Sequence, residues 1–264
     1  MRIVFVCALL ACALCLYDDL SGAELRAALR QDTYVNKHHT LGYSTARKKM
    51  YGYIDQQGDD YSSNGYVYGI YTDLKMKYKH GSSDTSQNGD LNCEHIVPQS
   101  FFNKQDPMRS DVHHLRPAYD VANSARNHYT FEEIPDADAY KWFKGKTQYS
   151  HTPSDPENWS RLMEDESAWG EHAWEPRDDN QGTVARAILY FYTMYDQYIC
   201  LDNKPCIEEM WKIGDVNMLI QWSADHPPSD WDRTRNERAE TYQGNRNPFV
   251  DSPELVERAF EDMI

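Results

Sequence analysis

The stretch Leu91–Phe131, LNCEHIVPQSFFNKQDPMRSDVHHLRPAYDVANSARNHYTF, decides the fold of this chain. Its beginning is typical of a strand that ends near Pro98, where the chain turns away. Its end predicts a helix over residues 117–127, because Pro117 suits a first helical turn and small apolar residues recur at helical spacing. These spaced residues are Ala118, Val121, Ala122 and Ala125.

Two asparagines lie near the packed face of this predicted helix. Asn123 falls at the edge of the apolar stripe, and Asn127 follows one turn later. An amide in that position projects from a rigid base toward whatever the helix covers. The alternative is that both are solvated or capping residues, which asparagine also favours.

The adjacent residues Glu94 and His95 are suited to two different roles. Neighbours on an extended segment point to opposite faces, so the two side chains cannot easily bind one metal ion in the same way. A carboxylate prefers a hard cation, whereas an imidazole with a pKa of about 6.5 accepts a proton from water near neutral pH. The pair therefore predicts a metal ligand beside a base.

A zinc site is the alternative for this stretch. Cys93, His95, His113 and His114 are all potential zinc ligands. However, Cys93 and His95 lack the usual two-residue gap, and the stretch holds no second cysteine. A structural zinc ion is therefore the weaker interpretation.

The rest of the chain predicts one α+β domain. Helical periodicity is strongest over residues 183–198, where the apolar stripe predicts core packing. Further helices are expected at 22–30, 44–56, 204–220 and 253–263. Residues 58–92 predict turns and short strands, and residues 150–180 an irregular segment rich in Pro, Asp, Glu and Trp. We find no internal repeat, low-complexity tract or linker.

Charge is distributed unevenly. The formal net charge is −15, with 17 basic against 18 acidic residues up to residue 150 and 10 against 24 after it. A protein that binds DNA tightly by neutralising many phosphates would be basic, so this class is disfavoured. An enzyme that engages a few nucleotides through a divalent cation remains compatible, since the cation supplies positive charge.

The N-terminus predicts export. Residues 1–16 combine an early Arg2 with an apolar run that is too short to span a bilayer comfortably, as in a signal peptide. Cleavage after Ala11, Ala13 or Cys15 is compatible, and Cys12 would permit lipoprotein anchoring in a bacterium. A buried N-terminal helix or strand is the alternative. No other segment predicts a membrane span.

Three of the six cysteines lie in this leader. Of the rest, Cys200 and Cys206 flank a turn-like sequence and predict a small disulfide loop in an oxidising compartment. Two independent thiols are the alternative. Cys93 is then unpaired.

Three ordered motifs in the first stretch resemble the endonuclease I family of secreted and periplasmic nucleases, in the ββα-metal (His-Me finger) superfamily. The similarity extends to two downstream segments and covers roughly residues 36–260. The motifs are Glu94–Pro98, Met108–Pro117 and Val121–Asn127, and the downstream segments are Arg186–Tyr190 and Gln243–Val250.

The resemblance implies a role for each matching residue. His95 would be the general base, and Glu94 and Asn123 would hold one divalent cation, Mg²⁺ with Ca²⁺ or Mn²⁺ as alternatives. The implied reaction is phosphodiester hydrolysis that leaves 5′-phosphate and 3′-hydroxyl ends. The implied fold is a ββα-metal core embedded in a mostly helical single domain, residues 17–264.

Other polar residues are candidates for supporting roles. Arg109 and Arg116 are candidate catalytic residues that stabilise charge, and Arg126 and Asn127 are candidates for substrate binding. Family members can supply a transition-state arginine between the first two motifs, where this chain has only Lys104 and Arg109. Asp111 and His113 could orient the site or act as structural residues. The segment 244–249 either turns the chain or touches substrate.

The sequence thus predicts a secreted or periplasmic endonuclease of low specificity, acting on DNA and potentially RNA, without a stable protein partner and as a monomer. The rival interpretation is an exported binding protein with a structural metal and no catalysis. Replacing His95 separates the two.

Overall fold

The computed structural model describes residues 17–58, 65–83, 90–164, 172–199 and 212–264. Helices and strands both contribute, which confirms the α+β class. The helices are α2 Gly22–Thr33, α3 Tyr43–Lys49, α4 Asp120–Arg126, α5 Asp178–Ile199, α7 Val216–Asp225, α8 Asp230–Gln243, α9 Pro248–Asp251 and α10 Leu255–Phe260. The strands are β1 Tyr66–Tyr68, β2 Lys75–Lys77, β3 Leu91–His95, β4 Leu115–Tyr119, β5 Thr130–Phe131, β6 Lys141–Lys144, β7 Thr147–Tyr149, β8 Ser160–Glu164 and β9 His172–Glu175.

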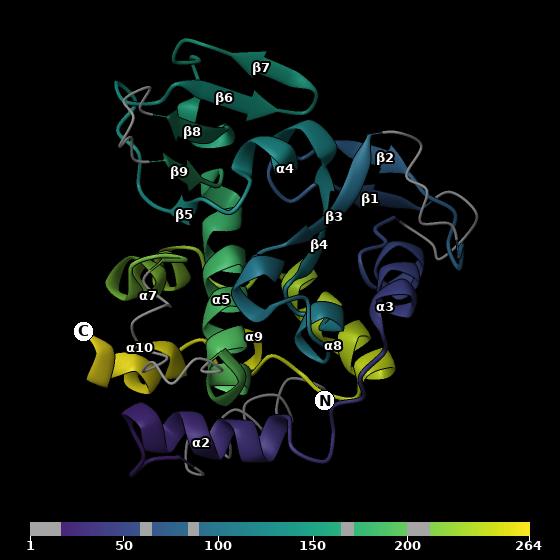
Figure 1. Ribbon diagram of the computed structural model, residues 1–264, viewed down its shortest axis with the longest axis vertical. Helices are drawn as coiled ribbons and strands as arrows, with labels where there is room; N and C mark the ends of the chain where they lie inside the picture. The colour runs from purple at the N-terminus through teal and green to yellow at the C-terminus, as the bar shows by residue number, and fades with distance from the viewer. Residues whose placement is uncertain (1–16, 59–64, 84–89, 165–171, 200–211) are drawn as a thin grey trace, which may run out of the picture.

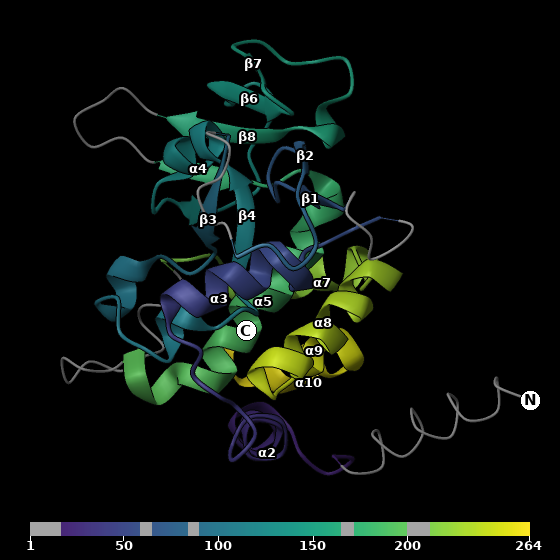
Figure 2. The same cartoon turned by 90° about the vertical axis from the view of Figure 1, so that its right-hand side faces the viewer.

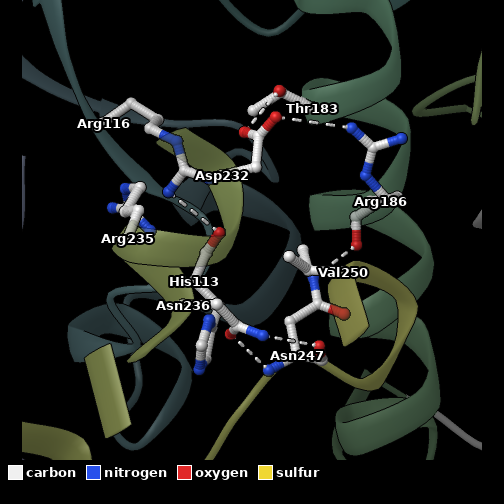
Figure 3. A pocket seen from close by; sticks show the side chains of 9 residues that line it. All are labelled: His113, Arg116, Thr183, Arg186, Asp232, Arg235, Asn236, Asn247 and Val250. Atoms are coloured by element: carbon white, nitrogen blue, oxygen red, sulfur yellow. Dashed lines mark hydrogen bonds and ion pairs between the residues drawn. The ribbon is translucent and has the colours of Figure 1, made fainter. Parts of the chain in front are cut away.

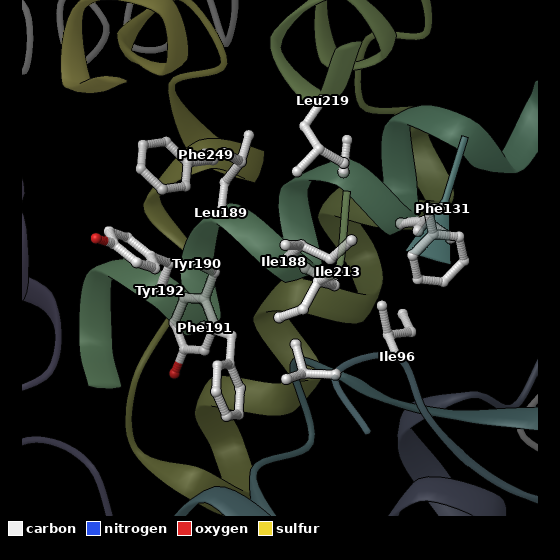
Figure 4. Packing of buried hydrophobic residues seen from close by; sticks show 14 of the residues in the cluster. Ile96, Phe131, Ile188, Leu189, Tyr190, Phe191, Tyr192, Ile213, Leu219 and Phe249 are labelled. Carbon is white, nitrogen blue, oxygen red and sulfur yellow. The ribbon is translucent and has the colours of Figure 1, made fainter. Parts of the chain in front are cut away.

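The long helix α5 runs through the middle of the molecule (Figure 1). Its apolar side chains from Val184 to Tyr195 are buried, as its periodicity predicts. They form the main core with side chains from the β3 end, β5, the segment before α7, α7 itself and α9 (Figure 4). Among them are Ile96, Phe131, Ile188, Leu189, Phe191, Ile213, Leu219 and Phe249.

The strands β3 and β4 form an antiparallel pair that leads directly into α4. Glu94 lies opposite Arg116 and His95 opposite Leu115 in the register. The helix α4 packs on both strands through its buried Ala122. A polar segment on β3 is therefore held against a short, rigid helix.

A second core lies on the other side of this strand pair. It joins α3, the π-helical turn Met50–Ile54, β1, β4 and α8 through residues with almost no exposure. Its members are Ala46, Met50, Tyr51, Ile54, Val67, Leu74, Leu91, Val112, Leu115 and Ala239. The β3–β4 pair is thus buried between two cores, which fixes its side chains.

The five-stranded sheet, in the order β5-β9-β8-β6-β7, was not expected. Two of its strands, β8 and β9, lie inside the segment 150–180 that was predicted to be irregular. Ser160 and Leu162 are buried while Arg161 and Met163 are half-buried, so β8 has the period-two pattern of a strand. This sheet also makes the expectation of a mostly helical domain only partly correct.

The predicted helix 117–127 is too long, because α4 begins at Asp120. Pro117 lies in β4 opposite Cys93, and its carbonyl oxygen accepts a hydrogen bond from Ile70 N at 2.8 Å. A proline fits there because a strand edge does not need its missing N–H. The expected stripe is broken as well, since Val121 is exposed.

Other helix predictions differ mainly at their ends. The helix expected at 44–56 becomes α3 followed by the π-helical turn, and the one at 253–263 becomes α10 and a final 3₁₀ turn. Within the expected helix 204–220, residues 212–215 are turn and bridge, and α7 starts only at Val216. The polar helix α8, which has a capping box at Ser229 and Asp232, was not predicted.

In the part of the chain that the structure describes, no helix is both long and apolar enough to cross a bilayer. The predicted signal peptide at residues 1–16 and the predicted Cys200–Cys206 disulfide both lie outside the described residues. Cys93 is a free thiol.

Candidate active site

The side chains of β3 divide between its two faces, as its extended backbone predicts. Asn92 and Glu94 contact α4 and its surroundings, because Asn123 Nδ2 donates to Asn92 Oδ1 at 2.5 Å. His95 lies on the other face, where its ring centroid is 5.3 Å from that of Tyr43 at the start of α3. The pair Glu94-His95 therefore presents a carboxylate and an imidazole in different directions.

The carboxylate of Glu94 is buried and held by two partners. Tyr71 OH donates to Glu94 Oε1 at 2.6 Å, and Arg126 Nη1 lies 3.3 Å from the same oxygen. Burial raises the pKa of Glu94, while Arg126 and the Tyr71 hydroxyl act to lower it. These partners orient the carboxylate and partly offset the cost of its burial.

Arg126 is placed differently from the substrate-binding role predicted for it. Its side chain is only 1% exposed, and Nη2 donates to the carbonyl oxygen of Ile96 at 2.8 Å. Its guanidinium therefore joins α4 to the end of β3 and to Glu94, and it does not reach the surface.

His95 is held in one tautomer. Its Nε2 lies 3.1 Å from the carbonyl oxygen of Arg109, which can only accept, so Nε2 carries the proton and Nδ1 keeps its lone pair. Burial lowers the pKa of His95 to about 3, assisted by the charge of His114 and opposed by the hydrogen bond to Arg109. The imidazole is therefore neutral at neutral pH and can accept a proton at Nδ1.

Arg109 lies beside His95, as its predicted role in stabilising charge requires. Its guanidinium carbon is 4.6 Å from the centre of the Tyr43 ring, and its Nε donates to Gln99 Oε1 at 3.1 Å. The side chain is half-buried. Its charge also acts on His95. Arg109 therefore has the position of a cation that can approach a phosphate near the base.

Arg116 occupies a different environment from His95. It lines a polar pocket between β4, α5 and α8 (Figure 3). Its Nη1 donates to the carbonyl oxygens of His113 and Leu115, both at 3.1 Å. Burial and the charge of Arg235 lower its pKa to about 9. The residues that line the pocket are His113, Arg116, Thr183, Arg186, Asp232, Arg235, Asn236, Asn247 and Val250. The structure therefore does not bring Arg116 to His95, contrary to its predicted catalytic role.

Asp111 and His113 form a buried network rather than part of the β3 site. Asp111 accepts from the hydroxyls of Tyr190 and Tyr195 at 2.8 and 2.6 Å and from Gln243 Nε2 at 2.8 Å. Burial acts to raise the pKa of Asp111, but His113 and other neighbouring groups lower it overall. His113 Nε2 donates to the carbonyl oxygen of Asn245 at 3.0 Å. The downstream segment 243–250 is therefore a structural anchor of the loop before β4.

Asn127 ends α4 with a positive φ of 54° and is exposed. It therefore remains accessible to a substrate, although its backbone also has a capping function. Asn123 is half-buried and lies on the side of β3 that carries Glu94. Asn123 therefore keeps the placement expected of it, whereas Asn127 is the exposed capping residue that the alternative describes.

Sequence reasoning missed Tyr71, Tyr43, Asn92 and His114 as neighbours of the site. Asn92 alternates with Glu94 along β3, and this spacing was a usable signal. His114 lies 5.4 Å from His95, centroid to centroid. Tyr71 and Tyr43 occur among many tyrosines in the chain, so no local pattern distinguishes them.

The zinc alternative finds no support. Within the described ranges, no three His, Cys, Asp or Glu side chains gather so that they could hold a metal ion. Cys93 is half-buried, with its Sγ 4.0 Å from Met50 Sδ, and burial raises the pKa of its thiol to about 12.

Comparison with known proteins gives a consistent result. The family model described as Endonuclease I matches residues 21–254. The chain is 30% identical to an extracellular ribonuclease of Bacillus amyloliquefaciens, over 90% of this chain and 74% of that protein. It is 29% identical to an extracellular ribonuclease of Bacillus subtilis, over 91% and 75% respectively. It is also 25% identical to a periplasmic deoxyribonuclease of Aeromonas hydrophila, over 57% and 49%.

Proposed function

Because the chain belongs to the endonuclease I family and is an endonuclease that acts on nucleic acid, we propose that it hydrolyses DNA and RNA with a divalent cation and low sequence specificity. The observation that carries this proposal is the paired arrangement on β3. The Arg109 carbonyl holds His95 in one tautomer, while Asn92 meets α4 at Asn123 and Glu94 meets it at Arg126. Relatives named as ribonucleases and deoxyribonucleases support both substrates.

The base in the proposed reaction is His95. Its Nδ1 takes a proton from the attacking water, while the Nε2–H stays on the Arg109 carbonyl and keeps the ring in place. A pKa of about 3 makes a weak base. A substrate phosphate brings negative charge next to the ring, which raises the pKa toward the value that proton transfer needs.

Glu94 and Asn123 would hold the cation. Their carboxylate and amide oxygens are the hard ligands that Mg²⁺ prefers, with Ca²⁺ and Mn²⁺ as alternatives. Asn92 accepts from the Nδ2 of Asn123, which leaves the amide oxygen as the ligand atom. When bound, the cation supplies positive charge for the developing phosphate and the leaving 3′-oxygen. The proposed products are 5′-phosphate and 3′-hydroxyl ends.

We further propose that β3, β4 and α4 form a ββα-metal (His-Me finger) core within one domain spanning residues 17–264. Two antiparallel strands followed directly by a helix support this assignment. Export through residues 1–16 is supported by relatives named as extracellular or periplasmic, whereas nothing supports anchoring at Cys12. We also propose that the protein is a monomer and that Cys200 and Cys206 form a disulfide.

Chelation tests the proposal directly. Excess EDTA should lower the cleavage of plasmid DNA and of single-stranded RNA by about two orders of magnitude, because the cation stabilises several kcal/mol of charge in the transition state. Added Mg²⁺ should restore both activities. A metal-independent ribonuclease serves as the assay control.

Cleavage that EDTA leaves unchanged would contradict the metal role. Binding of both nucleic acids without any cleavage in Mg²⁺, Mn²⁺ or Ca²⁺ would instead favour the rival function, an exported binding protein. The two outcomes are distinct, because one retains turnover and the other has none.

Arg109 is the arginine that we expect to act on the phosphate. Arg109→Gln should lower kcat by about 100-fold, the usual cost of losing one group that stabilises developing charge. Arg109→Lys should retain part of the rate, since a lysine keeps the charge but not the planar fork. The carbonyl that holds His95 belongs to the backbone and is preserved in both variants.

The matched control is Arg47→Gln. Arg47 also lies over the Tyr43 ring, at 5.5 Å, whereas the charges that act on His95 include that of Arg109. The Arg47 variant should leave kcat within about threefold of the wild-type value. Equal rates for Arg109→Gln and the wild type would remove Arg109 from the site.

A further inference from the structure

The two-stranded sheet β1–β2 carries tyrosines and lysines on one face. Tyr66 pairs with Lys77 and Tyr68 with Lys75 in the antiparallel register. Directly opposite residues share a face of a sheet, so these four side chains lie together. We call them the Tyr–Lys face. Val67 points the other way and is fully buried in the second core.

Contacts within the Tyr–Lys face are of the cation–π type. Lys75 Nζ lies 4.0 Å from the centre of the Tyr66 ring and 5.6 Å from that of Tyr68. Lys75 and Lys77 are exposed, and Lys79 continues the alternation beyond the strand. Aromatic rings and ammonium groups are thus interleaved on a surface open to solvent.

The lysines of this segment, Lys75, Lys77 and Lys79, alternate along β2 and just beyond it. Asp73 is the acidic residue of 65–83, and the flanking sequence adds Asp59, Asp60, Asp84 and Asp90. Asp73 lies 3.2 Å from Arg177, so its charge is engaged elsewhere. The Tyr–Lys face therefore presents ammonium groups that a polyanion can contact.

The β1–β2 sheet lies against the β3–β4 pair, whose strand β3 carries the candidate active site (Figures 1 and 2). Ile70 N donates to the Pro117 carbonyl oxygen at 2.8 Å, and Tyr71 donates to Glu94. At Gly69 a Cβ atom would meet the backbone N of Tyr119 at 3.0 Å, so the glycine permits this close approach. Only Gly69 and Ile70 thus separate Tyr68 from Tyr71, the tyrosine that holds the proposed metal ligand.

We propose that the Tyr–Lys face binds unpaired nucleotides of the substrate strand beside the scissile bond, with bases on Tyr66 and Tyr68 and phosphates on Lys75, Lys77 and Lys79. Interleaved aromatic and basic residues are the recognition chemistry of single strands. Only an unstacked base offers a face to a tyrosine ring, so the aromatic part selects single strands over duplexes. The inference rests on the proposed function, because it concerns the substrate of the same site.

Binding can be measured by fluorescence anisotropy in a His95→Ala background, so that the strand is not cut. The probes are a labelled single-stranded oligonucleotide, the same strand with abasic positions, and a duplex of equal length. The test variants are Lys75→Gln with Lys77→Gln, and Tyr66→Leu. The matched controls are Lys141→Gln and Tyr140→Leu, because Lys141 Nζ lies 5.2 Å over the exposed Tyr140 ring on the other sheet.

The double lysine variant should weaken binding of the single strand by about tenfold and reduce the slope of log K against log salt by about 1.4, roughly 0.7 for each lost phosphate contact. Tyr66→Leu should weaken binding of the intact strand by about tenfold, with little effect on the abasic strand or the duplex. Tyr66→Trp should retain the affinity, since indole also stacks.

Unchanged affinity in both test variants, or equal losses in the Lys141 and Tyr140 controls, would overturn the proposal. An equal loss for intact and abasic strands in Tyr66→Leu would also overturn it, because stacking would not be involved. Circular dichroism checks that each variant is folded. These binding measurements do not depend on cleavage. A negative result in the chelation assay would therefore not decide whether the Tyr–Lys face binds single strands, and the two proposals can be rejected independently.

Discussion

Replacing His95 by alanine should lower the rate of nucleic-acid cleavage by about 10³–10⁴-fold, the upper range for the loss of a general base. The lone pair at Nδ1 disappears, and the described residues offer no second imidazole in the same hydrogen-bonded position on Arg109. Added imidazole should restore part of the rate by entering the vacated space. The measurement is kcat on plasmid DNA and on RNA.

Glu94 and Asn123 remain in place in this variant, so binding of Mn²⁺ should be nearly unchanged. The exposed His151 provides the control, and its replacement by alanine should leave the rate at the wild-type level. Cleavage by His95→Ala within about tenfold of the wild type would remove His95 as the base.

The pH profile offers an independent check on His95. Its pKa is lowered to about 3, so the free enzyme keeps the lone pair down to that pH. We therefore expect kcat/KM to stay flat between pH 8 and 5, where an unperturbed imidazole would lose activity below about 6.5.

The second large effect is acid destabilisation by two buried imidazoles. Burial lowers the pKa of both His113 and His114 to about 4, although the nearby Asp111 acts to raise it. In the unfolded chain their pKa returns to about 6.5. The unfolded state therefore binds more protons below pH 6.5, and stability is lost as the pH falls from 6.5 to 4. The free energy of unfolding falls by about 3 kcal/mol for each imidazole, which is large compared with a typical free energy of unfolding of about 5–15 kcal/mol.

His114→Phe separates the two contributions. A phenylalanine keeps the ring packing against Phe102 and Phe191 but cannot take a proton, and it loses the hydrogen bond to Met108. Urea unfolding should show a free energy about 1 kcal/mol lower at pH 7. Between pH 6 and 4.5 its slope should be shallower than that of the wild type by about 1.4 kcal/mol per pH unit, one proton fewer. Identical slopes would show that His114 does not bind a proton on unfolding.

Local periodicity predicted the parts of the fold in which neighbours along the chain determine the structure. The helix α5 follows from its continuous apolar stripe, and the opposite faces of Glu94 and His95 follow from the strand period. The sheet β5–β9 could not be predicted in the same way. Its strands are short, and β5 pairs with β9, more than forty residues later in the chain.

The same distinction between local patterns and long-range contacts applies to the candidate site. Glu94, His95 and Asn123 come from one stretch and could be named from it. Tyr71, which holds Glu94, reaches the site only because β1 is fixed against β4. Pro117 shows why boundaries are uncertain, because a proline suits both a first helical turn and a strand edge.

The hydrogen bonds of Gln243 to Asp111 and to Val112, which lies 131 residues earlier, set an order of assembly during synthesis. During synthesis, the loop that precedes β4 leaves the ribosome long ahead of Gln243, whose side-chain amide holds that loop. Until that amide appears, Asp111 lacks one of its donors and Arg109 is carried on an unsecured segment. The segment that carries Arg109 can therefore be fully anchored only after residue 243 has been synthesised.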